Sequence, residues 1–198
     1  MNSKINSVVK AVYDLGYCIS EGFFEAEAID SLLSLLNIKQ NKLTSAGIGK
    51  RQNFIKAPEI RSDKILWIDR GDDSTLDKLF FPTIEELILQ LNRRCFLGLN
   101  SFEFHFAMYE PGAFYKKHRD SFSNDDARKI TVILYLNKNW KEGDGGELEL
   151  YTQDNKLTVQ PKSGTLVVFE SNLEHEVLPG NKNRYSITGW LKNTKNIF

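Results

Sequence analysis

The sequence is poor in the residues that build disulfide frameworks and structural zinc sites. Its two cysteines, Cys18 and Cys95, lie far apart, and neither belongs to a C-x-x-C pair. Such spacing supports neither a zinc site nor a disulfide framework, so each cysteine is expected to be a free thiol within an apolar segment. Free thiols fit a reducing compartment, and we therefore predict a cytoplasmic protein.

Long apolar runs and an excess of charge of one sign are also missing. No stretch approaches the roughly 20 apolar residues of a transmembrane helix, and the first residues lack the apolar segment of a signal peptide. The 26 lysines and arginines balance 26 aspartates and glutamates, which leaves no net charge. Neither a membrane nor a nucleic acid is therefore expected as the main partner.

The length of 198 residues suits one domain with a substantial core. We expect a single domain over residues 1–198, in which residues 1–100 form mainly helical support and a lid loop. Residues 101–192 are expected to form a β core that carries the active site.

Helical periodicity is confined to the first half of the chain. Apolar spacing predicts helices at Ile5–Leu15, Glu25–Leu36 and Thr83–Phe96, with Thr83 as the N-cap of the third helix. Between the second and third helices, the polar and glycine-bearing segment Asn41–Ser62 has no clear period. It reads as a long loop, and long loops in compact domains often serve as lids or binding elements.

From Ser101 onward the pattern becomes that of strands. Aromatic and polar residues alternate from Phe102 to Ala107, and glycine-bearing turns separate the segments that follow. Further strands are expected at 130–136, 147–151, 156–159, 165–169 and 185–191. Many short strands of this kind predict a β-sandwich or jelly roll. With the helices packed on its outer face, the fold class is α+β.

Two of the three histidines, His118 and His175, are candidate metal ligands. In an extended strand, residues i and i+2 share a face, so His118 and Asp120 would project together while Arg119 points away. Together with His175 they match the facial triad of non-haem Fe(II) oxygenases. A zinc hydrolase can use the same ligands, so these residues alone do not define the metal. His105 alternates with phenylalanines and reads as a structural or exposed histidine.

Arg184 favours iron chemistry over the alternatives. It follows His175 after the turn Leu178–Asn183, so the two residues can lie on neighbouring antiparallel strands. A guanidinium group binds a carboxylate through two parallel hydrogen bonds. A metal-chelating keto acid with a distal carboxylate would therefore bridge the metal and Arg184. A metal-binding module without redox activity does not need such an anchor.

Five sequence strings accompany the triad in a fixed order. They are Ile60–Ile68 (IRSDKILWI), Leu134–Trp140 (LYLNKNW), Gly145–Leu148 (GGEL), His175–Pro179 (HEVLP) and Arg184–Thr188 (RYSIT). With the H-x-D motif at His118 and Asp120, this series resembles the 2-oxoglutarate/Fe(II)-dependent dioxygenases. Within them it is similar to the prolyl 4-hydroxylase branch, which includes the hypoxia-sensing prolyl hydroxylases and their bacterial relatives. The resemblance runs from about residue 8 to residue 192.

The resemblance implies roles for individual residues. His118, Asp120 and His175 would be the iron ligands, and Arg184 would pair with the far carboxylate of 2-oxoglutarate. Three further residues match positions of the same co-substrate pocket: Tyr109, Tyr135 and Thr188. The implied fold is a double-stranded β-helix, a cupin-like jelly roll, with the N-terminal helices packed on one face.

The resemblance also implies the reaction. Fe(II), 2-oxoglutarate and O₂ would be used, with ascorbate as a supporting reductant. A prolyl residue of a protein or peptide would be hydroxylated, with release of succinate and CO₂. Two alternatives stay open on the residues alone. One is the same chemistry on a free amino acid or another small molecule, and the other is a non-redox metal-binding jelly-roll module.

Overall fold

The structure, a computed structural model, describes residues 2–47, 57–121 and 127–194. Its helices in these ranges are α1 (Asn2–Leu15), α2 (Ala26–Ile38), α3 (Ser74–Leu79) and α4 (Phe81–Cys95), with a 3₁₀ turn at Gln40–Lys42. None of these described helices is long and apolar enough to cross a membrane. Both cysteines are free, as predicted, and both are half-buried.

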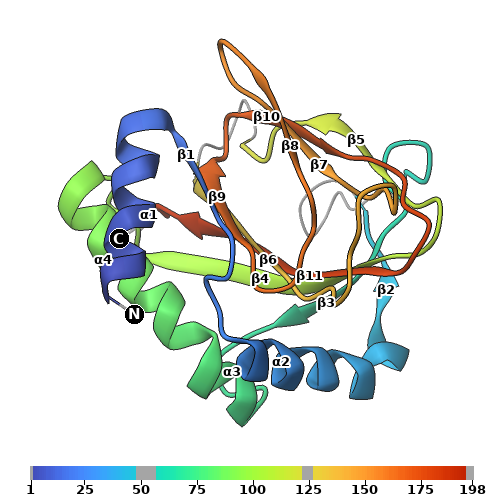
Figure 1. The fold of residues 1–198 in the computed structure, drawn as a ribbon. Coiled ribbons are helices and arrows are strands. Elements are labelled where there is room, and N and C mark those ends of the chain that lie inside the picture. The colour runs from blue at the N-terminus through green and yellow to red at the C-terminus, as the bar shows by residue number, and fades with distance from the viewer. Residues whose placement is uncertain (1, 48–56, 122–126, 195–198) are drawn as a thin grey trace.

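Two antiparallel sheets form the β part of the molecule (Figure 1). The larger sheet contains, in spatial order, β1 (Tyr17–Ser20), β9 (Leu166–Glu170), β6 (Arg128–Tyr135), β11 (Arg184–Lys192), β4 (Ser101–Tyr109), β3 (Lys64–Ile68) and β2 (Thr44–Ser45). The smaller sheet contains β5 (Tyr115–His118), β10 (Glu174–Val177), β7 (Leu148–Tyr151) and β8 (Lys156–Val159). The helices gather on the side of the larger sheet that faces away from β5, β7, β8 and β10.

The helices predicted from apolar spacing are present, but one predicted cap is wrong. The helix α4 begins at Phe81, so Thr83 lies inside its first turn and is buried. Pro82 occupies the first turn, where the missing N–H group costs no hydrogen bond. The helix begins before the predicted cap because Phe80 and Phe81 are both fully buried, and their packing decides where the helix starts.

The short helix α3 was not anticipated from the sequence. Its N-cap is Asp73, whose carboxylate accepts a hydrogen bond from the backbone N–H of Thr75 at 2.9 Å. Six residues are too few for a clear apolar period, so a cap followed by one buried residue, Leu76, was the only local signal.

The predicted lid loop Asn41–Ser62 is only partly described. Residues 48–56 lie outside the described residues, so that part of the prediction has no structural counterpart here. The described flanks are more regular than expected, because β2 pairs with β3 through Thr44 and Ile65. At the other flank, Arg61 forms an isolated antiparallel bridge with Tyr115.

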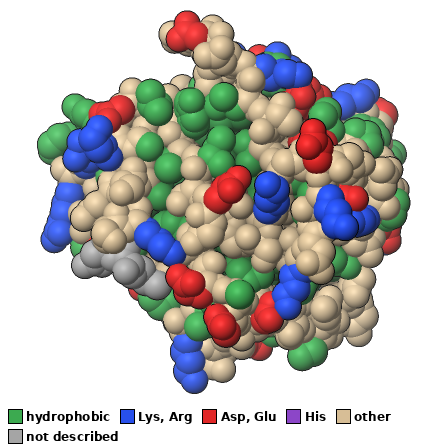
Figure 2. Space-filling model, in the orientation of Figure 1, with side chains coloured by type: hydrophobic (Ala, Val, Ile, Leu, Met, Phe, Trp, Pro, Cys, Tyr) green, Lys and Arg blue, Asp and Glu red, His purple; other side chains and the backbone are tan. Residues whose placement is uncertain are grey.

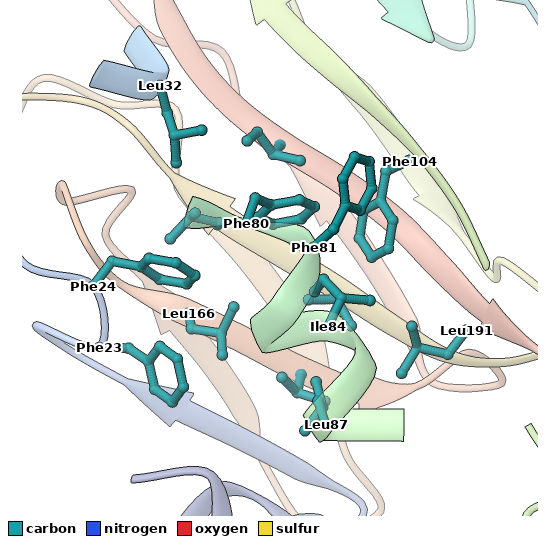
Figure 3. Packing of buried hydrophobic residues seen from close by; sticks show 14 of the residues in the cluster. Phe23, Phe24, Leu32, Phe80, Phe81, Ile84, Leu87, Phe104, Leu166 and Leu191 are labelled. Atoms are coloured by element: carbon teal, nitrogen blue, oxygen red, sulfur yellow. The ribbon is translucent and has the colours of Figure 1, made fainter. Parts of the chain in front are cut away.

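The outer face of the larger sheet packs against the helices, as the sequence predicted. Phe104 from β4 meets Phe80 edge-to-face, with ring centroids 5.0 Å apart. Ile84 and Leu87 of α4 and Leu166 of β9 belong to the same cluster (Figure 3). Burying each side chain of this kind contributes about 1.5–3 kcal/mol before the entropy of ordering is subtracted. The cluster attaches the helical half firmly to the sheet.

The inner face of the larger sheet looks toward the smaller one. Strand alternation turns Ala107 and Tyr109 of β4, with Ile133 and Tyr135 of β6, into a second cluster that also includes Leu148 of β7. Between these two faces lies a pocket, described below. On the surface view, charged side chains of both signs are interspersed (Figure 2), in agreement with the zero net charge.

Candidate metal centre and co-substrate pocket

The three predicted ligands meet between the two sheets. Nε2 of His118 lies 3.6 Å from Oδ1 of Asp120, and Nε2 of His175 lies 3.4 Å from Oδ2 of the same carboxylate. One ligand atom from each residue falls within 4.8 Å of the others. In the described part of the chain, these are the residues that cluster as a possible metal site.

Asp120 reaches this position differently from what strand alternation predicted. The strand β5 ends at His118, so Asp120 does not share a strand face with it. Instead the chain bends, and the backbone N–H of Asp120 donates to the carbonyl of Ser171 at 3.0 Å. The hydroxyl of Thr131 donates to Oδ2 of Asp120 at 2.8 Å. These two bonds hold the carboxylate against the histidines after the strand has ended.

Both histidines are oriented by their second ring nitrogen. Nδ1 of His118 lies 2.7 Å from the carbonyl of Lys116, and Nδ1 of His175 lies 3.0 Å from the carbonyl of Leu173. A carbonyl can only accept, so each Nδ1 must carry the proton and donate. In the neutral imidazole each Nε2 then keeps its lone pair, and both Nε2 atoms lie beside the Asp120 carboxylate. This is the second-sphere pattern of metal-bound imidazoles, and the donor set fits a divalent transition metal.

The electrostatics of the cluster suit a cation. Burial alone would raise the pKa of the Asp120 carboxyl, but His175 and His118 hold this pKa well below its ordinary value. Burial lowers the pKa of His118, and this effect outweighs the contact with Asp120. At His175 burial acts in the same direction, but Asp120 outweighs it and raises the pKa. The cluster thus offers an ionised carboxylate beside imidazoles of differing basicity.

Arg184 faces the same pocket from the opposite sheet. The turn Leu178–Asn183 predicted that Arg184 and His175 lie on neighbouring antiparallel strands, and this prediction is wrong. His175 lies on β10 of the smaller sheet, whereas Arg184 lies on β11 of the larger one. Both nevertheless line one pocket. The Arg184 side chain is buried, and its Nε has no hydrogen-bond partner among the described residues. A buried donor left unpaired indicates a missing anionic partner.

The predicted co-substrate residues differ in how they contact the pocket and the Arg184 guanidinium group. Its carbon Cζ lies 4.8 Å from the ring centre of Tyr109 and 4.9 Å from that of Tyr135. Nη2 of Arg184 donates to the Tyr135 hydroxyl at 3.3 Å. Tyr109 and Thr188 line the pocket, while Tyr135 stands behind Arg184, fully buried. Burial raises the pKa of both tyrosines, so their hydroxyls stay protonated and can donate.

Gly146, from the GGEL string, makes room for Arg184. Its φ of +69° is in the left-handed region, which favours glycine. A Cβ at this position would lie 3.3 Å from Cδ of Arg184 and 3.2 Å from the ring of Trp140. The string therefore has a physical explanation, since a side chain here would press on the arginine stem.

Several pocket residues were not assigned a role from sequence. Thr131 bonds the ligand carboxylate, and Arg61 and Tyr115 line the pocket. Thr131 could have been found from its alternation with Ile133 on β6, and Arg61 lies in the string Ile60–Ile68, whereas Tyr115 carried no comparable local signal. The pocket has an empty volume of about 430 Å³, including its open mouth.

His105, read as structural or exposed, is buried on the inner face. Its ring lies 5.0 Å from that of Trp67 and 5.5 Å from that of Trp190. Burial, followed by the charge of Arg61, lowers its pKa to about 4, so it is neutral near pH 7. His105 lines the pocket but is not among the clustered metal ligands.

Comparison with known proteins supports this site. The family described as the 2OG-Fe(II) oxygenase superfamily matches residues 104–192. The chain is 29% identical over 201 residues to a hypoxia-inducible factor prolyl hydroxylase from Caenorhabditis elegans. That match covers 92% of this chain but only 27% of the nematode protein. The chain thus spans about a quarter of that relative.

Two solved structures cover most of the chain. A prolyl-4-hydroxylase from Pseudomonas putida is 36% identical, with a TM-score of 0.87 and coverage of 96% of this chain and 99% of the other. A Trichoplax adhaerens prolyl hydroxylase, solved with a hypoxia-inducible factor peptide, is 31% identical with a TM-score of 0.83. It covers 96% of this chain, which itself covers 89% of that structure.

These likenesses confirm the α+β double-stranded β-helix predicted from the sequence. They also give Fe(II) and 2-oxoglutarate as the metal and co-substrate, in accord with the ligand set. The chain belongs to the 2OG-Fe(II) oxygenase superfamily, within its prolyl 4-hydroxylase branch.

Proposed function

We propose that this chain is an Fe(II)- and 2-oxoglutarate-dependent dioxygenase that hydroxylates a prolyl residue of a protein or peptide. The observation that carries the proposal is one pocket in which a His, Asp, His cluster faces a buried arginine with an unpaired Nε. Its relatives named as prolyl hydroxylases support the reaction, and the peptide complex of one relative supports a peptide substrate.

The protein's contribution to the reaction follows from its own groups. His118 and His175 would bind the metal through Nε2, and Asp120 would supply one carboxylate oxygen. Three protein ligands leave the remaining positions open for co-substrate and O₂. A bound Fe(II) supplies the O₂ activation, with conversion of 2-oxoglutarate to succinate and CO₂ and hydroxylation of the substrate carbon.

Arg184 would anchor the far carboxylate of 2-oxoglutarate, because its buried guanidinium lines the same pocket as the metal cluster and its Nε has no partner among the described residues. The protonated hydroxyl of Tyr109 and that of Thr188 would complete the binding of the co-substrate. Tyr135 would act through its hydrogen bond with Arg184. The apolar walls made by Ile133, Leu148 and Val177 reduce the access of water. In this low-dielectric setting the arginine–carboxylate pair is strengthened, and orientation of the reactants can remove several kcal/mol from the barrier.

The proposal extends to the organisation and setting of the chain. Residues 1–198 would act as one catalytic domain in which residues 1–100 give support and residues 101–192 carry the site. The segment 41–62 would serve as a lid over the substrate. Ascorbate would act as the supporting reductant, and a cytoplasmic location would keep both iron and thiols reduced.

The test is succinate release by protein purified without O₂, loaded with Fe(II), 2-oxoglutarate and ascorbate, and then exposed to O₂. Iron-dependent succinate is expected from the wild type and from Arg119→Ala, whose exposed side chain pairs with Glu174 and does not line the pocket. Asp120→Ala should release none while keeping a cooperative unfolding transition. Full succinate release by Asp120→Ala would contradict the ligand assignment.

Adding substrates separates the prolyl reading from its alternatives. Proline-containing peptides should increase succinate release and gain one oxygen atom, as mass spectrometry would show. Stimulation by free proline or another small molecule instead would favour a metabolite substrate. Binding of metal without any binding of 2-oxoglutarate would favour a non-redox module.

A further inference from the structure

A β-bulge changes the direction of the side chains next to His118. On β10, His175 and Val177 are two residues apart, but their partners on β5, His118 and Tyr115, are three residues apart. In a regular strand, residues i and i+3 point to opposite faces. The extra residue in β5 removes this opposition, so Tyr115 and His118 can project to the same side.

The result is a close stack of the two rings. The centroids of Tyr115 and His118 lie 3.5 Å apart, and the ring planes differ by only 15°. On the Tyr115 ring also lies the guanidinium of Arg61, whose Cζ is 4.2 Å from the ring centre. Guanidinium, phenol and imidazole thus form a contiguous group, referred to below as the Arg61–Tyr115–His118 stack.

The far end of this stack is fixed to the sheet. Nε and Nη2 of Arg61 donate to the two carboxylate oxygens of Asp63 at 2.8 and 2.6 Å. Asp63 is almost fully buried, with 1% of its surface exposed. A bidentate pair of this kind restricts the plane of the guanidinium as well as its position.

The two histidines of the cluster differ in how much support they receive. His175 lies within β10 and pairs with His118 on one side and Leu150 on the other. Phe169 packs edge-on against its ring, with centroids 4.8 Å apart. His118 is the last residue of β5 and pairs with β10 alone. Its ring is therefore held by the Lys116 carbonyl and the face of Tyr115, together with the ring of His175, whose centroid lies 4.2 Å away.

Resting on the proposed function, we propose that Arg61 and Tyr115 are positioning residues for the metal ligand His118. The stack holds the imidazole plane so that Nε2 points at the metal before the metal arrives. Without it, rotation of the ring would have to be frozen on binding, at a cost in affinity. The two residues act through His118 and set how tightly the centre binds its metal.

The test is the affinity for Co(II) in protein free of 2-oxoglutarate and O₂, followed by the visible absorption that reports the geometry of the bound ion. Tyr115→Leu removes the aromatic face, and we expect binding to weaken by about tenfold or more, the range found for outer-sphere partners of metal ligands. Tyr115→Phe keeps the ring and should bind within roughly twofold of the wild type. The absorption of Tyr115→Leu should also change, whereas that of Tyr115→Phe should not.

A matched control is Tyr151→Leu. Tyr151 is another aromatic residue of the smaller sheet, on β7, and it does not line the pocket. Its removal should leave the Co(II) affinity and spectrum unchanged. If Tyr115→Leu binds Co(II) with wild-type affinity and spectrum, the positioning role is refuted. An equal loss in Tyr151→Leu would also refute it, because the effect would then be a general weakening of the sheet.

A second substitution covers the case in which Tyr115→Leu shows no cooperative unfolding. Arg61→Lys keeps a cation near Asp63 but loses the planar group over the ring, and it should weaken Co(II) binding several-fold. Wild-type affinity in this variant would overturn the proposal.

His118→Ala separates a failure of the positioning proposal from a failure of the proposed function. If His118→Ala itself leaves Co(II) binding unchanged, the ligand assignment is wrong rather than the stack alone.

Discussion

The outer and inner faces of the larger sheet are made by the same strands but differ in chemistry. On β4, Phe104 and Phe106 face the helices, whereas His105, Ala107 and Tyr109 face the pocket. The outer face is dry, apolar and linked by many small contacts. The inner face holds buried polar atoms that have no hydrogen-bond partner among the described residues, such as Nδ1 of His105 and Nε of Arg184.

The difference shows how one sheet divides stability from chemistry. Apolar burial contributes roughly in proportion to area and is shared among many side chains. Buried polar groups without partners cost free energy, and they are retained where a ligand can satisfy them. Substitutions on the outer face should therefore change stability, and those on the inner face should change binding.

The largest effect is expected from truncation on the outer face. Phe104→Ala removes a fully buried ring that packs against Phe80. It should lower the free energy of unfolding by about 3–5 kcal/mol, as measured by urea denaturation. The Co(II) affinity of the remaining folded protein should stay unchanged. A loss of Co(II) affinity at full folding would show that the two faces are not independent.

His105 lies on the inner face, but its substitution should change stability, because burial of this residue makes the stability depend on pH. Its pKa in the folded protein is lowered from 6.5 to about 4, so the unfolded chain binds a proton that the folded chain excludes. Stability from this group is present above pH 6.5 and is lost as the pH falls toward 4. His105→Leu should remove about 3 kcal/mol of that acid dependence. Denaturation of the metal-free wild type and of the metal-free variant at pH 7 and pH 4 measures this difference. If both proteins lose the same unfolding free energy between the two pH values, the burial effect is contradicted.

Arg184→Lys tests the inner face directly. Lysine retains the charge but loses the planar fork that can bind both oxygens of a carboxylate. The affinity for 2-oxoglutarate should fall about tenfold to hundredfold, in line with hydrogen bonds to charged groups. Calorimetric titration of the Co(II)-loaded protein measures this change, and the Co(II) affinity serves as the internal control. Unchanged 2-oxoglutarate binding would remove Arg184 from the co-substrate site.

The smallest effect is expected at Tyr135, which stands behind Arg184. Tyr135→Phe removes the hydroxyl that accepts a hydrogen bond from Arg184 at 3.3 Å and keeps the fully buried ring. The 2-oxoglutarate affinity should weaken by roughly twofold to tenfold, since one hydrogen bond contributes about 0.5–1.5 kcal/mol. The same titration measures it. A loss as large as that of Arg184→Lys would mean that the hydroxyl contacts the co-substrate itself.

The elements with a local sequence signal could be predicted. Strand alternation on β4 and β6 and the helical period of α1 depend on neighbouring residues, and the structure confirms these elements. Local reasoning failed at Thr83, because the burial of Phe80 and Phe81 decided where α4 begins. It also missed the Arg61–Tyr115–His118 stack, which depends on a bulge and on contacts between distant segments.

By itself, the sequence determined which residue types are available and how they are ordered. The motif around His118 and Asp120, with His175 and Arg184 downstream, was enough to predict the ligand set and the fold class, because ligand chemistry and strand periodicity are properties of residues in order. Only the tertiary structure decided that Arg184 faces His175 from the opposite sheet. It also decided that Asp120 joins the cluster through a bend anchored by Ser171. Both outcomes depend on pairing between segments distant in sequence, which no local pattern encodes.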